Sequence, residues 1–307
     1  MKNTINFYYN IFLDELIKKD NCYYFYYGGD EYYFVPLNRP YDDVQSIYKL
    51  NLEMKKRRCL VHELVLNKDK SIITVVNGIS YVLIKLCKYK NDKVFLNDIN
   101  YIQNMTVNIE CDKSLVRNDW IKLWSEKIDY YEYQISQVGK KYPLLCDSLS
   151  YFIGMGENAI SYLVNNLDSK TNVNLVVSHK RIYQERGSLN FYDPLNFVVD
   201  SRVRDVAEFI KETFYNKTLN LYDLKSYFNM ANLNKNEYIL LLGRLLFPTY
   251  YFDIYDDIIN NGKSEELVIN IIDRTDEYES LLNTIYKFIL YEKKVRLEPI
   301  EWLQDKN

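Results

Sequence analysis

The side chains whose types and spacing could together support catalysis lie between Val176 and Asp205. His179 follows the apolar stretch LVVS, and Lys180 and Arg181 come directly after it. A short strand ending in histidine, then loops, a second short strand and a capped amphipathic helix is the layout of a phosphoryl-transfer segment. In such a segment an acidic residue after the histidine accepts the hydroxyl proton. The sequence therefore predicts the layout of a kinase with positive charge at the position of its base.

The first third of the chain predicts a small α+β lobe that would support this segment. Asn3–Lys19 is expected to be an amphipathic helix or a mixture of helix and strand. The turn Gly28–Gly29–Asp30 between two aromatic runs predicts a hairpin. A helix is predicted over Tyr41–Arg58, and two or three further strands over Cys59–Tyr89. This order of elements is that of a kinase-type N-lobe, which many other α+β domains share.

The remainder of the chain predicts a mainly helical lobe. Lys90–Asp112 is expected to be a polar, irregular connection, and the lobe boundary is placed near Tyr101. The predicted domains are thus an N-lobe over residues 1–100, with an antiparallel sheet and a helix, and a C-lobe over residues 101–307. Helices are predicted at about Pro143–Asn166 and at Arg204–Lys217, with a buried strand at Val173–Ser178 between them. A long helix before them carries one apolar stripe, formed by Trp120, Leu123, Trp124, Ile128 and Tyr131.

Composition narrows the class of protein. Hydrophobic residues make up 48% of the 307 residues, and the net charge is −3, which predicts a globular chain without nucleic acid as a partner. The five cysteines are widely spaced and form no C-x-x-C pair, so they predict idle thiols in a reducing compartment. No apolar run approaches the ~18 residues of a membrane span. The 31 tyrosines reflect either codon bias or a surface that joins other proteins.

Four segments of the chain resemble one protein family in their amino-acid sequence and in their order along the chain. The segments are GMGENAISYL (Gly154–Leu163), VRDVAEFIK (Val203–Lys211), RLLFPTYYFDIYDDII (Arg244–Ile259) and EPIEWL (Glu298–Leu303). Together they resemble the spore coat kinase-like family, in its CotS-like and most closely its YutH-like members, from about Trp120 to the last residue. The resemblance implies a bilobal fold like those of protein kinases and aminoglycoside phosphotransferases, with a small mixed N-lobe and a helical C-lobe.

The catalytic loop of that family, H-G-D-x-x-x-x-N, is incomplete in this chain. His179 matches the histidine, but Lys180 and Arg181 stand at the glycine and the catalytic aspartate, and Arg186 at the metal-binding asparagine. A guanidinium cannot serve as a base and would repel magnesium. The resemblance places the metal-binding aspartate at Asp193 or Asp200, and spacing leaves both open.

Several matching residues also have a purely structural interpretation. Asp193 precedes a proline and predicts a turn as readily as a metal ligand. Asp205 is predicted to cap the helix that follows it, and His179 to bond loop backbone. In the N-lobe, the strand expected to end with a phosphate-binding lysine has Val35, Pro36 and Arg39 there instead.

Three hypotheses about function follow from these residues. The first is a catalytically degenerate kinase-like protein, a pseudokinase, that acts in sporulation by assembling the spore coat. The alternative is a divergent small-molecule or protein phosphotransferase that uses ATP and magnesium, with Glu185 or Asp168 as its base. The third is an anion site formed by Lys180, Arg181 and Arg186, unless these residues instead pair with acidic neighbours, namely Glu185, Asp200 or Glu208.

The lack of a long apolar run predicts a protein without a membrane span that is cytoplasmic when synthesised. The resemblance also implies later deposition on the spore coat, with other coat proteins as partners. ATP and magnesium are expected as cofactors only if the nucleotide cleft is retained.

Overall fold

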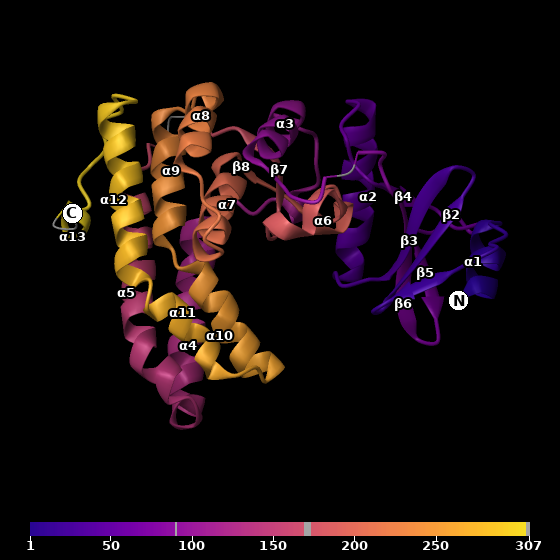
Figure 1. Cartoon of the computed structure of the whole chain (residues 1–307), viewed down its shortest axis with the longest axis horizontal. Helices are drawn as coiled ribbons and strands as arrows, with labels where there is room; N and C mark the ends of the chain where they lie inside the picture. The colour runs from indigo at the N-terminus through magenta and orange to yellow at the C-terminus, as the bar shows by residue number, and fades with distance from the viewer. Residues whose placement is uncertain (90, 169–172, 305–307) are drawn as a thin grey trace. The chain divides into compact units, whose positions relative to one another are not determined.

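The computed structural model of this chain describes residues 1–89, 91–168 and 173–304, which form two compact units (Figure 1). Unit 1 consists of Met1–Val116 together with Leu175–Asp200. Unit 2 consists of Arg117–Asn174 together with Ser201–Asn307. The predicted boundary between residues 100 and 101 does not coincide with this division, and the two predicted lobes stay a prediction.

The N-terminal part of unit 1 is an antiparallel sheet with the strand order β1-β2-β3-β6-β4, in which β5 also pairs with β6. Its strands are β1 (Ile17–Lys19), β2 (Cys22–Tyr27), β3 (Asp30–Pro36), β4 (Glu63–Val65), β5 (Ile73–Val76) and β6 (Ile79–Lys85). Helices α1 (Lys2–Tyr9) and α2 (Tyr41–Lys56) belong to the same unit. Of the two possibilities for Asn3–Lys19, the structure therefore has the mixture of helix and strand.

Two hairpin turns fix the register of this sheet. Gly28 and Gly29 lie between the paired residues Tyr27 and Asp30, with φ of 60° and 80°. Positive φ at both central residues is the type I′ geometry that suits the twist of two-residue hairpins. The predicted hairpin is confirmed, and Asn77–Gly78 connects β5 to β6 in the same way, with φ of 50° and 79°.

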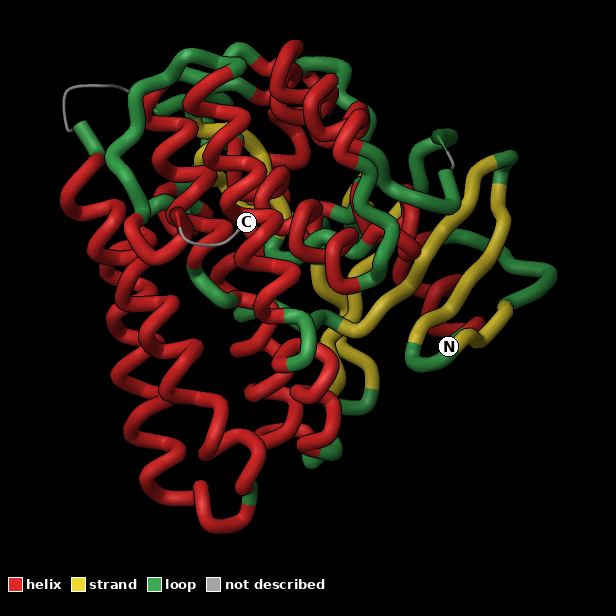
Figure 2. The backbone as a smooth tube through the Cα atoms, turned by 60° about the vertical axis from the view of Figure 1, so that its left-hand side comes forward, coloured by secondary structure: helices red, strands yellow, loops and turns green. Residues whose placement is uncertain are grey.

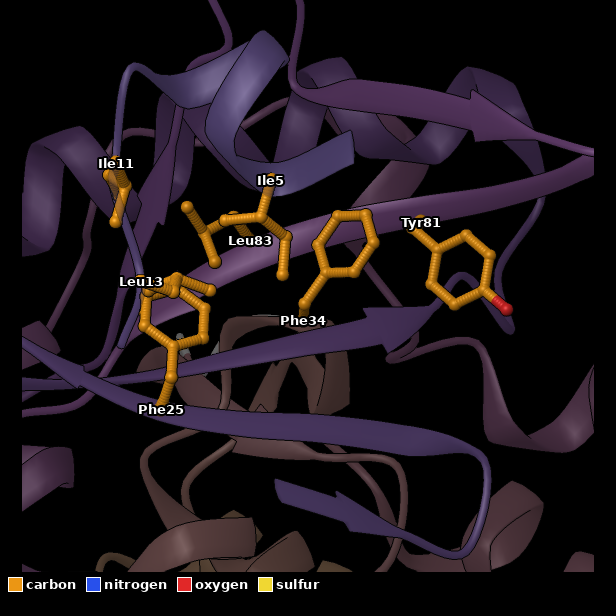
Figure 3. Close-up of a cluster of buried hydrophobic side chains, with 7 residues drawn as sticks. All are labelled: Ile5, Ile11, Leu13, Phe25, Phe34, Tyr81 and Leu83. Carbon is orange, nitrogen blue, oxygen red and sulfur yellow. The ribbon is translucent and has the colours of Figure 1, made fainter. Parts of the chain in front are cut away.

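The two faces of the sheet have different partners. Because successive side chains of a strand alternate between faces, Phe34 of β3 points opposite to its neighbours Tyr33 and Val35. Figure 3 shows the face of Phe34 packed under α1, where seven buried side chains form a core cluster: Ile5, Ile11, Leu13, Phe25, Phe34, Tyr81 and Leu83. The opposite face, which carries Tyr33 and Val35, lines a cavity.

Unit 1 also contains a second, two-stranded sheet of β7 (Leu175–His179) and β8 (Phe197–Ser201). The segment between these two strands, Lys180–Asn196, is called the loop segment. Helix α3 (Leu96–Thr106) packs on β7, where Val177 N donates to Thr106 Oγ1 at 3.0 Å. The prediction of an irregular connection over Lys90–Asp112 is thus wrong for the residues of α3. Short helices connect the two strands: η3 (Gln184–Arg186), α6 (Gly187–Phe191) and η4 (Pro194–Asn196); η1 (Lys113–Leu115) follows α3.

Unit 2 is built from helices (Figure 2). They are α4 (Trp120–Val138), η2 (Gly139–Lys141), α5 (Pro143–Asn166), α7 (Val203–Tyr215), α8 (Leu221–Ala231), α9 (Lys235–Leu246), α10 (Thr249–Asn261), η5 (Glu265–Val268), α11 (Ile269–Ile272), α12 (Thr275–Tyr291) and α13 (Glu301–Gln304). Four residues of the predicted stripe on α4 are buried, whereas Leu123 is 40% exposed. The α+β class, with a small antiparallel sheet and a mainly helical remainder, is confirmed. No helix among the described residues is long and apolar enough to cross a membrane.

Candidate functional site

A cavity of about 870 Å³ in unit 1 brings together most of the residues singled out in the loop after His179. Lys180, Arg181 and Arg186 line it on the loop side, and Asp193 lines it as well. The sheet side of the cavity consists of Cys22, Tyr33, Val35, Pro36, Ile84 and Leu86. The three basic residues predicted as a cluster therefore face one cavity.

His179 ends β7 and is buried beneath this loop, with 1% of its surface exposed. Its Nε2 lies 2.7 Å from the carbonyl oxygen of Phe191, and its ring stacks on the Phe191 ring at 4.4 Å between centroids. The predicted contact between this histidine and loop backbone is present. His179 thereby fixes the end of α6 beneath the cavity.

Hydrogen bonds hold Lys180 and Arg181 in place at the start of the loop. Lys180 N donates to the carbonyl oxygen of Asn196 at 2.8 Å, and the Asn196 side-chain amide donates to the carbonyl oxygen of Arg181 at 3.0 Å. The guanidinium of Arg181 donates to the carbonyl oxygen of Lys180 at 2.8 Å. These bonds tie the loop after β7 to the start of β8.

Arg186 is held by a separate set of contacts. Its guanidinium lies 4.3 Å from the centroid of the Tyr183 ring, a cation–π contact. The next residue, Gly187, has a φ of 54°, and a Cβ atom there would lie 2.2 Å from the carbonyl oxygen of Asn91. Ser188 N donates to that same oxygen at 2.8 Å. Only glycine allows the backbone to approach so closely.

Two of the three acidic neighbours proposed as alternative partners of the basic cluster form ion pairs with other residues. Glu185 pairs with Lys93 at 2.9 Å. Glu208 belongs to unit 2, where it pairs with Arg244 at 2.9 Å and with Lys211 at 3.7 Å.

The two candidate metal aspartates occupy different environments. Asp193 lines the cavity and caps η4, with its carboxylate accepting a hydrogen bond from Leu195 N at 2.9 Å. The predicted Asp-Pro turn is therefore present. Asp200 lies in β8, is fully buried and is absent from the residues that line the cavity.

Burial raises the pKa of the Asp193 carboxyl from 3.8 to about 6. The hydrogen bond from Leu195 N acts in the opposite direction, as do the electrostatic interactions of the carboxyl with Arg39, His179 and Lys180. The net effect is a raised pKa, because desolvation destabilises the charged carboxylate more than these neighbours stabilise it.

The predicted helix cap at Asp205 is wrong in its position. Helix α7 begins at Val203, so its N-cap residue is Arg202 and Asp205 lies inside the first turn, buried. The helix starts earlier because β8 ends at Ser201 and the chain turns into α7 without a loop. A carboxylate in the first turn still interacts favourably with the helix dipole.

The strand expected to carry the phosphate-binding lysine presents Tyr33, Val35 and Pro36 to the cavity. Arg39 is buried, and its guanidinium donates to the carbonyl oxygen of Phe197 at 2.8 Å and lies 3.6 Å from Asp43. This arginine therefore connects the segment between β3 and α2 to β8, a structural role.

His62 also lines the cavity and links the sheet to α6. Its Nδ1 accepts a hydrogen bond from Cys87 N at 3.1 Å, so the proton sits on Nε2, which donates to the carbonyl oxygen of Leu189 at 3.1 Å. Burial lowers the pKa of His62 from 6.5 to about 4, so the imidazole is neutral at neutral pH.

Sequence patterns missed several residues of the cavity. Lys19 and Asp20 come from the turn between β1 and β2, and Asn190 and Asn196 from the loop opposite. Asp20 has a φ of 54°, and a short polar turn between two strands was the only signal available in the sequence. Nothing in that turn indicates which distant loop it faces.

The residues around this cavity fit an anionic ligand better than a magnesium–nucleotide complex. Magnesium bound with nucleotide phosphates takes carboxylate oxygens and water molecules as further ligands. Four basic side chains and two carboxylates line the cavity, and the charge of Lys180 acts directly on Asp193. Among the described residues, no group of three or more His, Cys, Asp and Glu side chains is arranged to hold a metal ion.

Solved phosphotransferases share the fold of this chain. An aminoglycoside phosphotransferase from Alicyclobacillus acidocaldarius aligns with 92% of this chain and 94% of its own, with a TM-score of 0.63 and 10% identity. A spectinomycin phosphotransferase in complex with ADP and spectinomycin aligns over 99% and 97%, with a TM-score of 0.60 and 9% identity. An amicoumacin kinase in complex with AMP-PNP and Ca²⁺ aligns over 98% and 95%, with a TM-score of 0.51 and 12% identity. At these identities the likeness shows the fold alone.

Among curated proteins, the endospore coat-associated protein YutH of Bacillus subtilis (strain 168) is 30% identical over 207 residues. The aligned region is 60% of this chain, and the chain spans about three fifths (61%) of the length of that relative.

A family model described as "Spore coat putative kinase YutH" matches residues 2–285. The match includes the N-terminal part, where the sequence resembled the family only in its order of elements, and it ends before Glu298–Leu303. The chain therefore belongs to the YutH family of spore coat kinase-like proteins.

Proposed function

We propose that this chain is a catalytically degenerate kinase that takes part in assembly of the spore coat. The observation that carries the proposal is the basic lining of its cavity, where Lys180, Arg181 and Arg186 stand at positions that the family resemblance assigns to catalysis and metal binding. Membership of the YutH family supports the link to the coat.

The chemical argument concerns proton transfer and charge. Arg181 stays protonated and cannot accept the proton of an attacking hydroxyl group. The described residues of β3 supply no lysine to the cavity. Since phosphoryl transfer in kinases depends on positioning and on electrostatic stabilisation, loss of either part alone lowers the rate by several orders of magnitude.

The proposed role in the coat is supported by the description of a curated relative and of the matching family. The curated relative is named as an endospore coat-associated protein, and other coat proteins are the proposed partners of this chain. In this proposal the chain is made in the cytoplasm and then deposited on the spore, where its surface rather than a catalytic step carries its function.

The test is an ATP turnover assay on the purified full-length chain with Mg²⁺ or Mn²⁺. Released phosphate and transfer of labelled phosphate to protein are both measured. We expect neither to exceed the level of the heat-denatured protein. Turnover that is lost in Asp193→Ala, with the variant still folded by circular dichroism, contradicts the proposal.

The second candidate is a divergent phosphotransferase that uses ATP and magnesium. It is favoured by the presence of two carboxylates, Asp20 and Asp193, along the same cavity. Both lie close enough to Cys22 that their charges raise the pKa of its thiol, after the larger effect of burial. The same turnover assay separates the two functions, because this candidate requires metal-dependent turnover.

A further inference from the structure

The cavity of unit 1 continues into a second one along the sheet. A volume of about 340 Å³ is lined by Tyr24, Cys87, Tyr89, Asn91 and Ser188, and by the carboxylates of Asp92 and Glu185. The two cavities share His62, Leu86, Arg186 and Leu189. Arg186 thus stands at the junction of a mainly basic chamber and a chamber with aromatic, amide, hydroxyl and carboxylate groups. Cavities of this size are typical of small-molecule sites.

Arg186 is held in place before any ligand arrives. Arg186 stacks on Tyr183 at 4.3 Å, and the segment that carries it is fixed by backbone hydrogen bonds, with Ser188 N donating to Asn91 at 2.8 Å and Val94 N to Gln184 at 2.9 Å. Preorganised guanidinium groups lose little side-chain freedom when they bind, and this favours affinity.

The charged side chains and the space in the two cavities indicate which kind of ligand they can bind. Arginine binds phosphate oxygens through two parallel hydrogen bonds, and lysine adds a point charge. A ligand whose phosphate is held by three cationic side chains needs no divalent cation to neutralise it. The second chamber leaves room for an organic group attached to that phosphate, against Leu86 and Tyr24.

We propose that the joined cavities bind a phosphate monoester without a metal ion, with Lys180, Arg181 and Arg186 holding the phosphate and the second chamber holding the organic group. This inference rests on the proposed loss of catalysis at the same site. The monoester is either an aryl or alkyl phosphate or a nucleoside monophosphate, since both carry the same dianionic group.

The test is isothermal titration calorimetry of the full-length chain in EDTA. Phenyl phosphate and AMP represent the two sources of the monoester, and inorganic phosphate lacks an organic group. We expect phenyl phosphate or AMP to bind at least tenfold more tightly than inorganic phosphate, and the tighter of the two identifies the source. Arg181→Gln and Arg186→Gln are each expected to weaken that binding at least tenfold.

Arg58→Gln is the matched control, since Arg58 is an exposed arginine of unit 1 outside both cavities. Circular dichroism checks that each variant is folded. If Arg181→Gln unfolds, Arg186→Gln still tests the inference, because Arg186 is exposed. The inference is overturned by absence of binding in EDTA, by binding that requires Mg²⁺, by equal affinity for inorganic phosphate, or by equal binding of all variants. Absence of binding leaves the loss of phosphotransfer intact, because the turnover assay tests that independently.

Discussion

At the scale of single residues, the side chains after β7 decide which chemistry this fold can support. Lys180 and Arg181 stand where the family resemblance places a glycine and the catalytic aspartate, and both line the cavity. In our proposal the charge at the position of the base is therefore reversed, and a reversed charge also changes which ions are attracted. Asp193 remains as a carboxylate in this basic environment, and its protonation offers a direct probe of the site.

Replacing Asp193 by Asn should change how stability depends on pH. The folded pKa of about 6 exceeds the unfolded value of 3.8, so this carboxyl contributes stability that is fully present below pH 3.8 and is lost as pH rises through 6. Asn keeps an oxygen that can accept from Leu195 N but does not titrate. We expect the free energy of unfolding of the variant, relative to the natural chain, to rise by up to about 3 kcal/mol from pH 4 to pH 7.

Urea titrations between pH 4 and pH 7.5 measure this difference. His62 acts in the opposite direction, because its lowered pKa makes stability fall as pH drops from 6.5 towards 4. It is present in both proteins, so its contribution cancels in the comparison. Asp69→Asn, at an exposed aspartate outside the cavity, controls for the change from carboxylate to amide. A difference that is independent of pH, or that falls as pH rises, shows that the environment assigned to Asp193 is wrong.

The residues of the site could be predicted from sequence only where they lie in one segment. Lys180, Arg181, Arg186 and Asp193 belong to the stretch between β7 and β8, and their shared cavity follows from that proximity. Lys19 and Asp20 come from a turn more than 150 residues earlier in the chain, and no local pattern indicates which loop such a turn faces. Spacing left the choice between Asp193 and Asp200 open, whereas the structure brings only Asp193 to the cavity.

At the scale of elements, local turn and helix signals were the most reliable predictors. Gly28–Gly29 specified its hairpin because positive φ at two successive residues favours glycine, and the predicted bounds of α5 agree with the structure. The helix α3 was missed because its residues are polar on most sides; its buried positions, such as Ile99 and Ile102, become clear only against β7. Asp205 was placed at a helix end although α7 starts at Val203, since the sequence does not show where a strand passes directly into a helix.

Gly187 is the position on which the arrangement of η3 and α6 depends. A Cβ atom at Gly187 would lie 2.2 Å from Asn91 O and 2.7 Å from Asp92 O, and both are backbone atoms that cannot rotate away. Gly28 also has a positive φ, of 60°, but no atom lies within 4 Å of a Cβ built there. Gly28→Ala should therefore cost only the backbone strain of about 1 kcal/mol, and Gly187→Ala roughly 2–3 kcal/mol more.

Differential scanning calorimetry and urea titration of the two variants give this comparison. We also expect Gly187→Ala to weaken phosphate binding, because a displaced η3 moves Arg186, whereas Gly28→Ala should leave it unchanged. Equal destabilisation by the two substitutions means that the close approach of Gly187 to Asn91 does not hold the loop.

At the scale of the whole molecule, the fold agrees with the family, whereas the loss of the catalytic residues is our proposal. Solved phosphotransferases share the fold at about 10% identity, so the fold tolerates nearly complete replacement of its side chains. The sequence predicted this fold class from its order of elements and from its resemblance to the family. It could not predict that residues 175–200 group with the N-terminal 116 residues, because a compact unit made of two separate chain segments leaves no local signal.

The most direct test of the account is the effect of Mg²⁺ on ATP binding by the intact chain. Melting temperature is measured with and without ATP, in EDTA and in MgCl₂, with MgCl₂ alone as the control. A ligand at 100 times its dissociation constant adds about 2.7 kcal/mol of stability, which is readily visible as a shift. We expect Mg²⁺ not to enlarge any shift in melting temperature caused by ATP, since in the proposed assignment basic side chains stand at the metal-binding and catalytic positions. A rise in melting temperature that needs both ATP and Mg²⁺, and that disappears in Asp193→Ala, would contradict it.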